Sequence, residues 1–115
     1  MKNTLTLALK KLPFDVMVTG EKSREYRKPS KWIKSRLYKH GAKREYEFIK
    51  FVNGYGAHRP YFVCEFLYFF KSSEIENIQF SNGLAVDVER GDFVIALGEI
   101  IEKSDKVKCK DLRIF

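Results

Sequence analysis

The sequence predicts an α+β fold: a small, mixed, partly closed β-barrel with two short helices near its N-terminus. Five or six segments have the residue pattern of strands, and two early segments have the spacing of amphipathic helices. The 115 residues, 44% of them hydrophobic, are enough for one core but not for two. We therefore expect a single domain over residues 1–115, with an open α+β sheet as the alternative architecture.

The first strand and the first helix are predicted within residues 4–20. From Thr4 to Leu9, leucine alternates with smaller residues, as in a strand with one buried face. A short helix is expected from Pro13 to Thr19, because proline suits the first helical turn and apolar side chains then recur at helical spacing. Gly20 can end that helix in the left-handed conformation.

A charged strand and a second helix are predicted next. Residues 22–27 are expected to form a short extended segment, after which Lys28-Pro29-Ser30 interrupts the regular structure. Ser30 is a suitable N-cap for a helix from Lys31 to Lys39. We expect Trp32 to lie on the buried face of this helix, as part of the core; the alternative is that its ring stacks on a base.

The remaining chain is predicted to be mostly strands. The densest apolar run, Tyr61 to Phe70, is expected to be covered on both faces, as in the wall of a barrel. Gly98 is a candidate β-bulge in the last long strand, and residues 53–60 form a loop by composition. The predicted strands are 45–52, 61–70, 74–80, 93–101 and, as an edge strand, 107–115.

The net charge of +7 is concentrated in one segment of the chain. Residues 22–44 contain ten basic side chains and one acid, whereas the rest of the chain contains 12 basic and 14 acidic side chains. Local positive charge creates a directed field that attracts polyanions such as nucleic acids. The simpler alternative is a solvated, lysine-rich surface that keeps the protein soluble.

Composition also restricts the other classes of function. No apolar run is long enough to cross a bilayer, so no membrane association is expected. Cys64 and Cys109 lie in very different surroundings, which argues against a disulfide framework and favours a reducing, cytoplasmic location. His40 and His58 have no neighbouring Cys-x-x-Cys motif, so neither a metal site nor another cofactor is expected.

The segment that starts at Gly20 contains the motif Gly-x-Lys-x-x-Glu-x-Arg, formed by Gly20, Lys22, Glu25 and Arg27. A Leu-x-Leu strand precedes it at residues 7–9, and a Trp-Ile-Lys-x-x-Leu helix follows at residues 32–37. With these features, and with residues 51–56 and 95–100, the sequence resembles the ASCH domain (activating-signal-cointegrator homology), a group of PUA-like barrels. The similarity is to its small single-domain members from bacteria and phages, and it covers nearly the whole chain.

The resemblance implies a barrel whose cleft is lined by the motif and binds RNA or a nucleotide-like ligand. Some members of the family are enzymes: one type hydrolyses the amide of acetylated cytidine, and similar proteins are described as ribonucleases. In the amidohydrolase type, the position matching Glu25 is a threonine nucleophile, activated by the lysine that matches Lys22. A carboxylate cannot replace that hydroxyl in the same mechanism, so the amidohydrolase type ranks below nucleic-acid binding and stays among the alternatives.

Lys22, Glu25 and Arg27 are the main candidate site residues. Lys22 and Arg27 would hold a phosphate or the polar edge of a base, and Glu25 would accept hydrogen bonds from a base amino group. The alternative for Glu25 is a structural ion pair with Arg27 or Lys22. Side chains two apart in an extended chain share a face, so Arg27 would lie beside Glu25, whereas Lys22 would reach it only from a turn. In an enzyme, Lys22 and Glu25 would be the catalytic residues.

Further candidates lie on the second helix and in the central loop. Lys31 and Lys34 are expected to make salt-sensitive phosphate contacts. Tyr55 and Arg59, in the glycine-rich loop, would either close over a ligand or form an ordinary exposed turn. Glu65 interrupts the central apolar strand, and we expect it to form an ion pair rather than a buried carboxylate in the cleft floor.

These observations predict a nucleic-acid-binding module that prefers RNA, with a cleft at Lys22, Glu25 and Arg27 and a basic approach surface on the following helix. A nucleotide-like small molecule is the other ligand considered. Two further functions are open: an enzyme that acts on RNA or on a modified nucleoside, and a phage-derived module that binds a host protein. A nucleic-acid binder loses affinity steeply with salt and an enzyme yields a product, whereas an interaction module does neither.

Overall fold

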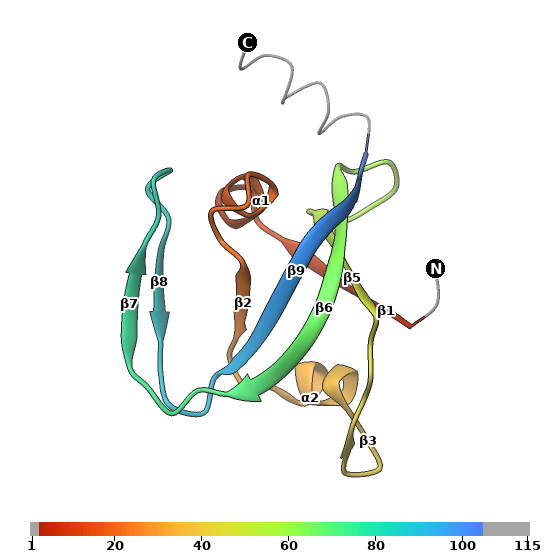
Figure 1. Cartoon of the computed structure of the whole chain (residues 1–115), viewed down its shortest axis with the longest axis vertical. Coiled ribbons are helices and arrows are strands. Elements are labelled where there is room, and N and C mark those ends of the chain that lie inside the picture. Colours follow the sequence, from red (N-terminus) through yellow and green to blue (C-terminus); the bar gives the residue numbers. More distant parts are fainter. Residues whose placement is uncertain (1–2, 105–115) are drawn as a thin grey trace.

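The protein is a small α+β molecule in which two short helices accompany a strongly curled β-sheet (Figure 1). This computed structural model describes residues 3–104. Within this range the helices are α1 (Lys11–Val18) and α2 (Lys31–Leu37). The strands are β1 (Thr4–Leu9), β2 (Arg24–Arg27), β3 (Tyr38–Lys39), β4 (Ala42–Lys43), β5 (Phe48–Asn53), β6 (Tyr61–Lys71), β7 (Glu76–Gln79), β8 (Ala85–Val88) and β9 (Phe93–Lys103).

The main sheet is a half-barrel with the strand order β1-β5-β6-β9-β2. β1 pairs with β5 in parallel, and the other neighbours pair antiparallel. β1 and β2 are therefore the two edges of the sheet. The curl brings these edges close enough for the Arg27 guanidinium, on β2, to donate a hydrogen bond to the Ala8 carbonyl, on β1, at 2.8 Å. A side chain thus bridges the seam at which a closed barrel would have a backbone ladder.

The hydrophobic core fills the space enclosed by the curled sheet and the two helices. α1 contributes Phe14 and Met17, α2 contributes Ile33 and Leu37, and Figure 1 shows the two helices at opposite ends of the sheet. The Phe14 ring meets Phe62 of β6 edge-on, with 5.2 Å between ring centroids. Since each such side chain contributes about 1.5–3 kcal/mol when fully buried, these contacts hold both helices against the sheet.

Two small hairpins extend from this body. β3 and β4 pair around His40 and Gly41, whose φ angles of 52° and 79° form the tight turn. β7 and β8 form the second hairpin, which stands apart from the main sheet on the left of Figure 1. In the turn of this hairpin, Ser81 donates two hydrogen bonds to the Glu21 carboxylate, from its backbone N–H at 2.8 Å and from its hydroxyl. The tip of the hairpin is therefore fastened to the segment that follows α1.

The structure confirms the local signals in the first third of the sequence. The strand Thr4–Leu9 is present with the predicted bounds, and its leucines are buried. Gly20 has a φ of 89°, the left-handed conformation expected at the end of a helix. Ser30 caps α2, because its hydroxyl accepts a hydrogen bond from the N–H of Ile33 at 3.1 Å. α1 starts at Lys11 rather than Pro13, since the Lys10 carbonyl accepts a hydrogen bond from the Phe14 N–H.

The β-bulge predicted at Gly98 is confirmed, and it explains Glu65. The β6–β9 register shifts between Cys64 and Phe66, and the Glu65 carboxylate accepts a hydrogen bond from the N–H of Glu99 at 2.9 Å. Glu65 therefore satisfies a backbone donor of the bulge. It forms none of the ion pairs found within residues 3–104, so the predicted ion pair is not borne out.

The prediction that Trp32 belongs to the core is wrong: 48% of this residue is exposed. Ile33 and Leu37, four residues apart, form the buried face of α2, and Trp32 is rotated by about 100° from Ile33 around the helix. The helix also ends at Leu37 instead of Lys39, because the chain becomes extended at the next residue to form the β3–β4 hairpin.

The later strands differ from the prediction in their extent. β5 starts at Phe48, because residues 44–47 connect the β3–β4 hairpin to the sheet and the Glu47 N–H bonds to the Asn3 carbonyl. β6 is covered on both faces only in its first part, since Leu67 and Tyr68 are exposed. β8 was not predicted, although Ala85–Val88 alternates in burial. The predicted edge strand 107–115 lies outside the described residues.

Candidate functional site

Lys22, Glu25 and Arg27 form one connected ion-pair cluster. The Lys22 ammonium nitrogen lies 3.0 Å from Oε1 of Glu25, and Nε of Arg27 lies 2.8 Å from Oε2 of the same carboxylate. Glu25 is buried, so one acid joins two cations away from bulk solvent. Glu25 therefore forms both of the structural ion pairs considered for it, one with Lys22 and one with Arg27. The cluster carries a net charge of +1.

Lys22 reaches the cluster because Gly20 turns the chain sharply after α1. Its ammonium group donates to the Arg24 carbonyl at 2.6 Å and to the Glu25 carboxylate at 3.0 Å, and it lies 3.5 Å from the sulfur of Met17. A lysine ammonium has three protons, so all of them have a partner. Only 2% of the side chain is exposed. Lys22 thus orients Glu25 and adds positive charge, but its own protons are already used.

Arg27 is the accessible member of the cluster. It donates from Nε to Glu25 and from Nη2 to Ala8, both at 2.8 Å, and 25% of its side chain is exposed. A guanidinium carries five N–H donors, so three of them have no partner among residues 3–104. Two fixed hydrogen bonds restrict the rotamer of this side chain. Arg27 therefore presents a preoriented cationic fork that is still able to bind an anion.

This fork lies in a groove at the open seam of the sheet, called here the edge groove. Two adjoining compartments share Ala8, Arg27, Gly54 and Tyr55 as their common wall. The inner compartment, about 420 Å³, lies between α1, β2 and the β7–β8 hairpin; its other walls include Pro13, Lys22, Glu25, Tyr26, Leu84 and Val86. The middle compartment, about 540 Å³, is completed by Thr6, Trp32, Val52 and Gly56. Both volumes fall in the range of small-molecule sites.

The groove continues past Trp32 into an outer compartment of about 310 Å³. This compartment shares Thr6 and Trp32 with the middle compartment and is completed by Thr4, Leu5, Arg36 and Tyr46. The Arg36 guanidinium lies over the Trp32 ring, 5.1 Å from its centre. The edge groove is therefore an elongated feature with three connected compartments.

Two exposed aromatic side chains stand at the walls of the edge groove. Tyr55 is 88% exposed at the tip of the loop after β5, and Trp32 is 48% exposed on α2. Tyr26, in the inner compartment, has a pKa above its usual value, because burial outweighs the lowering effect of the Arg24 charge. Its hydroxyl therefore stays protonated at neutral pH and remains a hydrogen-bond donor.

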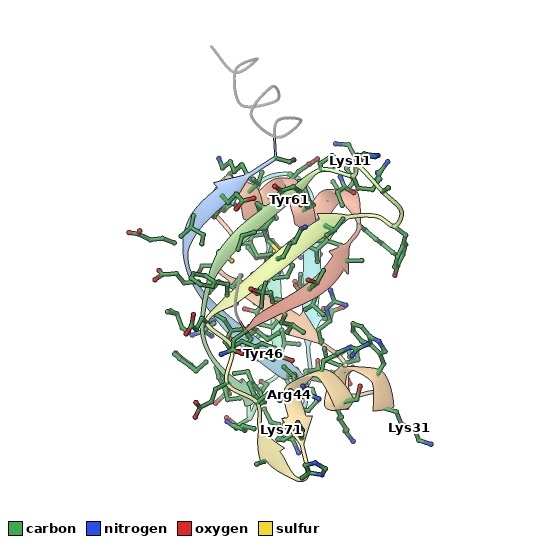
Figure 2. The ribbon with its side chains drawn as sticks, turned by 90° about the vertical axis from the view of Figure 1, so that its right-hand side faces the viewer. Lys11, Lys31, Arg44, Tyr46, Tyr61 and Lys71 are labelled. Atoms are coloured by element: carbon green, nitrogen blue, oxygen red, sulfur yellow. The ribbon has the colours of Figure 1, made fainter. Side chains whose placement is uncertain are left out.

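The other predicted contact residues are placed differently from one another. Lys31 and Lys34 are exposed on α2 but form no wall of the groove, and Figure 2 shows Lys31 projecting away from the helix. Tyr55 does line the groove, where a loop that closes over a ligand would place it. Arg59 does not: its Nε donates to the Asn53 carbonyl at 2.7 Å and its guanidinium packs against Gly54. Arg59 therefore supports the loop that carries Tyr55.

Several groups in the groove were not found from the sequence. The Ala8 carbonyl is a backbone group with no side-chain signature, and Leu84 and Val86 lie between the predicted strands 74–80 and 93–101, where no element is predicted. The alternation of Leu84, Val86 and Val88 was the signal that would have identified β8. Trp32, predicted to belong to the core, lines the groove wall.

Three further features were considered for the described residues: a metal site, a reactive thiol and a membrane-spanning helix. Residues 3–104 contain no group of three or more His, Cys, Asp or Glu side chains arranged to hold a metal ion. Burial, reinforced by the Glu65 charge, raises the pKa of the Cys64 thiol to about 12, so this buried cysteine is a packing residue rather than a nucleophile. Neither described helix is long and apolar enough to cross a membrane.

Comparisons with protein-family models, with curated proteins and with solved structures found no match.

Proposed function

We propose that this chain is a barrel-type domain of the ASCH group, within the PUA-like folds, that binds single-stranded nucleic acid in the edge groove and prefers RNA. One observation carries the proposal. A preoriented arginine fork lies at the boundary of two nucleoside-sized compartments, and two exposed aromatic side chains, Tyr55 and Trp32, line the same groove. Phosphates and bases alternate along a single strand, and the groove offers the matching groups side by side.

Arg27 supplies the phosphate contact in this proposal. Its remaining N–H donors permit bidentate hydrogen bonding to two phosphate oxygens, an arrangement that a lysine point charge does not offer. Glu25 and Ala8 hold the guanidinium before the ligand arrives, so little side-chain entropy is lost on binding. Trp32 and Tyr55 supply flat apolar surfaces on which bases stack, worth about 1–3 kcal/mol per base.

A basic end of the molecule supports the same ligand class. The exposed side chains of α2 and of the β3–β4 hairpin are predominantly cationic and include Lys31, Lys34, Arg36, Lys39, Lys43 and Arg44. Figure 2 shows Lys31 and Arg44 at this end of the molecule. Because the groove runs up to α2, the flanks of a longer strand would pass over these charges. Such contacts add affinity without sequence preference and weaken with salt.

The enzymatic alternative depends on Lys22 and Glu25, and their contacts favour a positioning role instead. A proton-transfer group must reach the substrate, whereas the Lys22 ammonium already has three partners and the Glu25 carboxylate is shared between two cations. The unpaired, buried thiol of Cys64 is compatible with a cytoplasmic location, which we include in the proposal.

The test is an anisotropy titration of a labelled 20-nucleotide single-stranded RNA at 50 and 200 mM salt, with matching DNA and duplex RNA as competitors. Wild type is expected to bind with strong salt dependence, and Arg27→Ala to bind at least about tenfold more weakly. Arg90→Ala is the matched control, because Arg90 is exposed and lines none of the three compartments. Thermal unfolding of each variant verifies that it is folded.

Three results would decide against the proposal or revise it. If wild type does not bind the RNA at 50 mM salt, the proposal is wrong. Equal binding by folded Arg27→Ala and wild type would remove the edge groove from the interface. A cleavage product on a gel of the same samples, absent with Lys22→Ala, would establish the enzymatic alternative.

A further inference from the structure

The three compartments of the edge groove lie in a row along a single strand. β1 contributes Ala8 and Leu9 to the inner compartment, Thr6 and Ala8 to the middle one, and residues 4–6 to the outer one. The row thus runs the whole length of β1, about 17 Å for five steps of about 3.4 Å. A groove of this length is suited to an extended chain rather than to one compact ligand.

The backbone of β1 is open toward this groove. The carbonyls of Asn3 and Leu9 accept hydrogen bonds from residues at the ends of β5, so odd-numbered positions face that neighbour. The Ala8 carbonyl faces the other way, where it accepts the bond from Arg27. Backbone groups two residues apart point to the same edge, so the amide of Thr6 also faces the groove. A base edge would therefore meet the main-chain amide of Thr6 on the floor of the groove.

Cationic groups stand at the boundaries between compartments. Arg27 lies between the inner and middle compartments. Trp32 separates the middle compartment from the outer one, and the guanidinium of Arg36 lies over its ring. The number and order of these groups, two guanidiniums among three compartments, correspond to two linking phosphates and three nucleosides.

We propose that the edge groove is a three-nucleotide track, in which an extended single strand follows the open edge of β1. One linking phosphate binds Arg27, the next binds Arg36, and Trp32 stacks on the base in the middle compartment. This inference rests on the proposed function. It specifies how many nucleotides the groove binds and which residue contacts each phosphate and base. The basic residues outside the track, such as Lys34, contact only the flanks of longer strands.

Another extended chain, a peptide strand added to β1, is disfavoured by the same geometry. Strand addition needs the backbone groups at the edge, and Arg27 already occupies the Ala8 carbonyl. A peptide would have to displace that bond and would offer no phosphate to Arg36 or to the remaining N–H donors of Arg27. A nucleic acid uses both guanidiniums and leaves the bridge across the seam intact.

The test is a length series of 5′-phosphorylated oligouridylates, from one to six nucleotides, measured by calorimetry with the full chain. Affinity is expected to rise about tenfold with each nucleotide up to three and to change much less beyond three. Arg36→Ala should lower the affinity of the trinucleotide about tenfold and leave that of the mononucleotide, which has a single phosphate, nearly unchanged. Lys34→Ala, on the same helix but outside the track, should affect only the hexanucleotide.

Each contrary outcome identifies which inference fails. If the mononucleotide binds as tightly as the trinucleotide, the track is wrong while nucleic-acid binding at Arg27 stands. If affinity rises steadily to six nucleotides and Arg36→Ala and Lys34→Ala behave alike, binding is electrostatic over the basic end and the track is also wrong. If neither these oligonucleotides nor the 20-nucleotide RNA bind, the proposed function itself fails.

Discussion

At the scale of single residues, the site is built around a buried carboxylate between two cations. Burying charges is costly, so a buried ion pair adds little net stability. The cluster instead fixes the orientation of Arg27, which Glu25 and Ala8 hold from two directions. The most charged residues of the motif therefore act together to position one accessible side chain.

This arrangement predicts an order of destabilisation. Glu25→Gln should lower the free energy of unfolding by about 3–5 kcal/mol, because it leaves two cations without their shared anion. Lys22→Met should cost less, about 1–3 kcal/mol, since Glu25 keeps Arg27 as a partner. Urea unfolding at pH 7 measures both, and a larger loss for Lys22→Met would show that the carboxylate is not the centre of the cluster.

Trp32 is the residue whose environment differs most from the sequence prediction. Because about half of it is exposed, Trp32→Ala should change the free energy of unfolding by less than about 1 kcal/mol. The same substitution should weaken RNA binding about tenfold, through loss of one stacking contact, and Trp32→Phe should restore most of the affinity. Tyr68→Ala, which removes another exposed ring outside the edge groove, is the control for anisotropy measurements. Equal effects of both alanine variants would contradict the role of Trp32.

At the scale of elements, the β7–β8 hairpin forms one wall of the groove while belonging to a separate sheet. Its turn is fastened by Ser81 to Glu21 and by the Asn82 amide, which donates to the Leu12 carbonyl at 2.9 Å. These bonds lie at the surface, far from the main core. The wall of the inner compartment thus depends on a few polar contacts.

Removing the Glu21 carboxylate should loosen this hairpin. The hydrogen bonds from Ser81, side chain first and then backbone, lower the pKa of Glu21 below 4.5 despite a small opposing effect of desolvation. The stabilisation by the hydrogen bonds from Ser81 to the ionised Glu21 carboxylate is therefore complete above pH 4.5. It is lost as the pH falls through the folded-state pKa of Glu21. Hydrogen exchange at pH 7 should be faster over residues 76–88 in Glu21→Ala and unchanged in β6. Unaltered exchange in the hairpin would show that packing alone holds it.

The bulge in β9 predicts a sharp intolerance at Gly98. A Cβ there would lie 2.9 Å from the Cβ of Glu65 and 2.6 Å from its Oε1, closer than packed atoms approach. Gly98→Ala should therefore cost about 1–3 kcal/mol, and the double variant with Glu65→Gly should recover part of the loss. Denaturant unfolding of the three variants gives the coupling energy. If the losses in free energy of unfolding of the two single variants simply add in the double variant, the Glu65 side chain is not what excludes a Cβ at position 98.

At the scale of the whole molecule, side chains tie β2 to both of its neighbours, β1 across the open seam and β9 within the sheet. Arg27 links β2 to β1, and Lys28, just after β2, donates to Asp92 at 2.7 Å, at the start of β9. Asp92 is buried and also accepts from the Glu89 N–H at 2.8 Å. The ends of β2 are thus tied to the sheet by charged groups as well as by its four-residue ladder.

Asp92 makes the attachment of β2 to the sheet sensitive to acid. Burial alone raises its pKa, but the hydrogen bonds from Lys28 and Glu89 and the Lys28 charge outweigh it, so the pKa lies below 3.8. A depressed carboxyl pKa stabilises the fold above pH 3.8, and this contribution is lost as pH falls through the folded-state value. Between pH 5 and pH 2, wild type should therefore lose stability more steeply than Asp92→Asn. Parallel urea midpoints for the two proteins would contradict this.

The sequence by itself determined what depends on neighbouring residues. The alternating leucines of β1, the Ser30 cap and the left-handed Gly20 act over a few positions, so each was predictable and each is present. The concentration of positive charge in residues 22–44 is likewise a property of composition. The pairing of Glu25 with Arg27 also followed from the two-residue period of a strand.

Only the tertiary structure decided where these elements meet. The bond from Arg27 to Ala8 joins residues 19 positions apart, and it exists because the curl of five strands brings two sheet edges together. The same curl aligns β1, the loop at Tyr55 and the β7–β8 hairpin around one groove. It also leaves Trp32 exposed, because whether an apolar side chain is buried depends on which distant segment covers it. The motif was readable in the sequence, whereas the groove that gives Arg27 access to a ligand is a product of long-range packing.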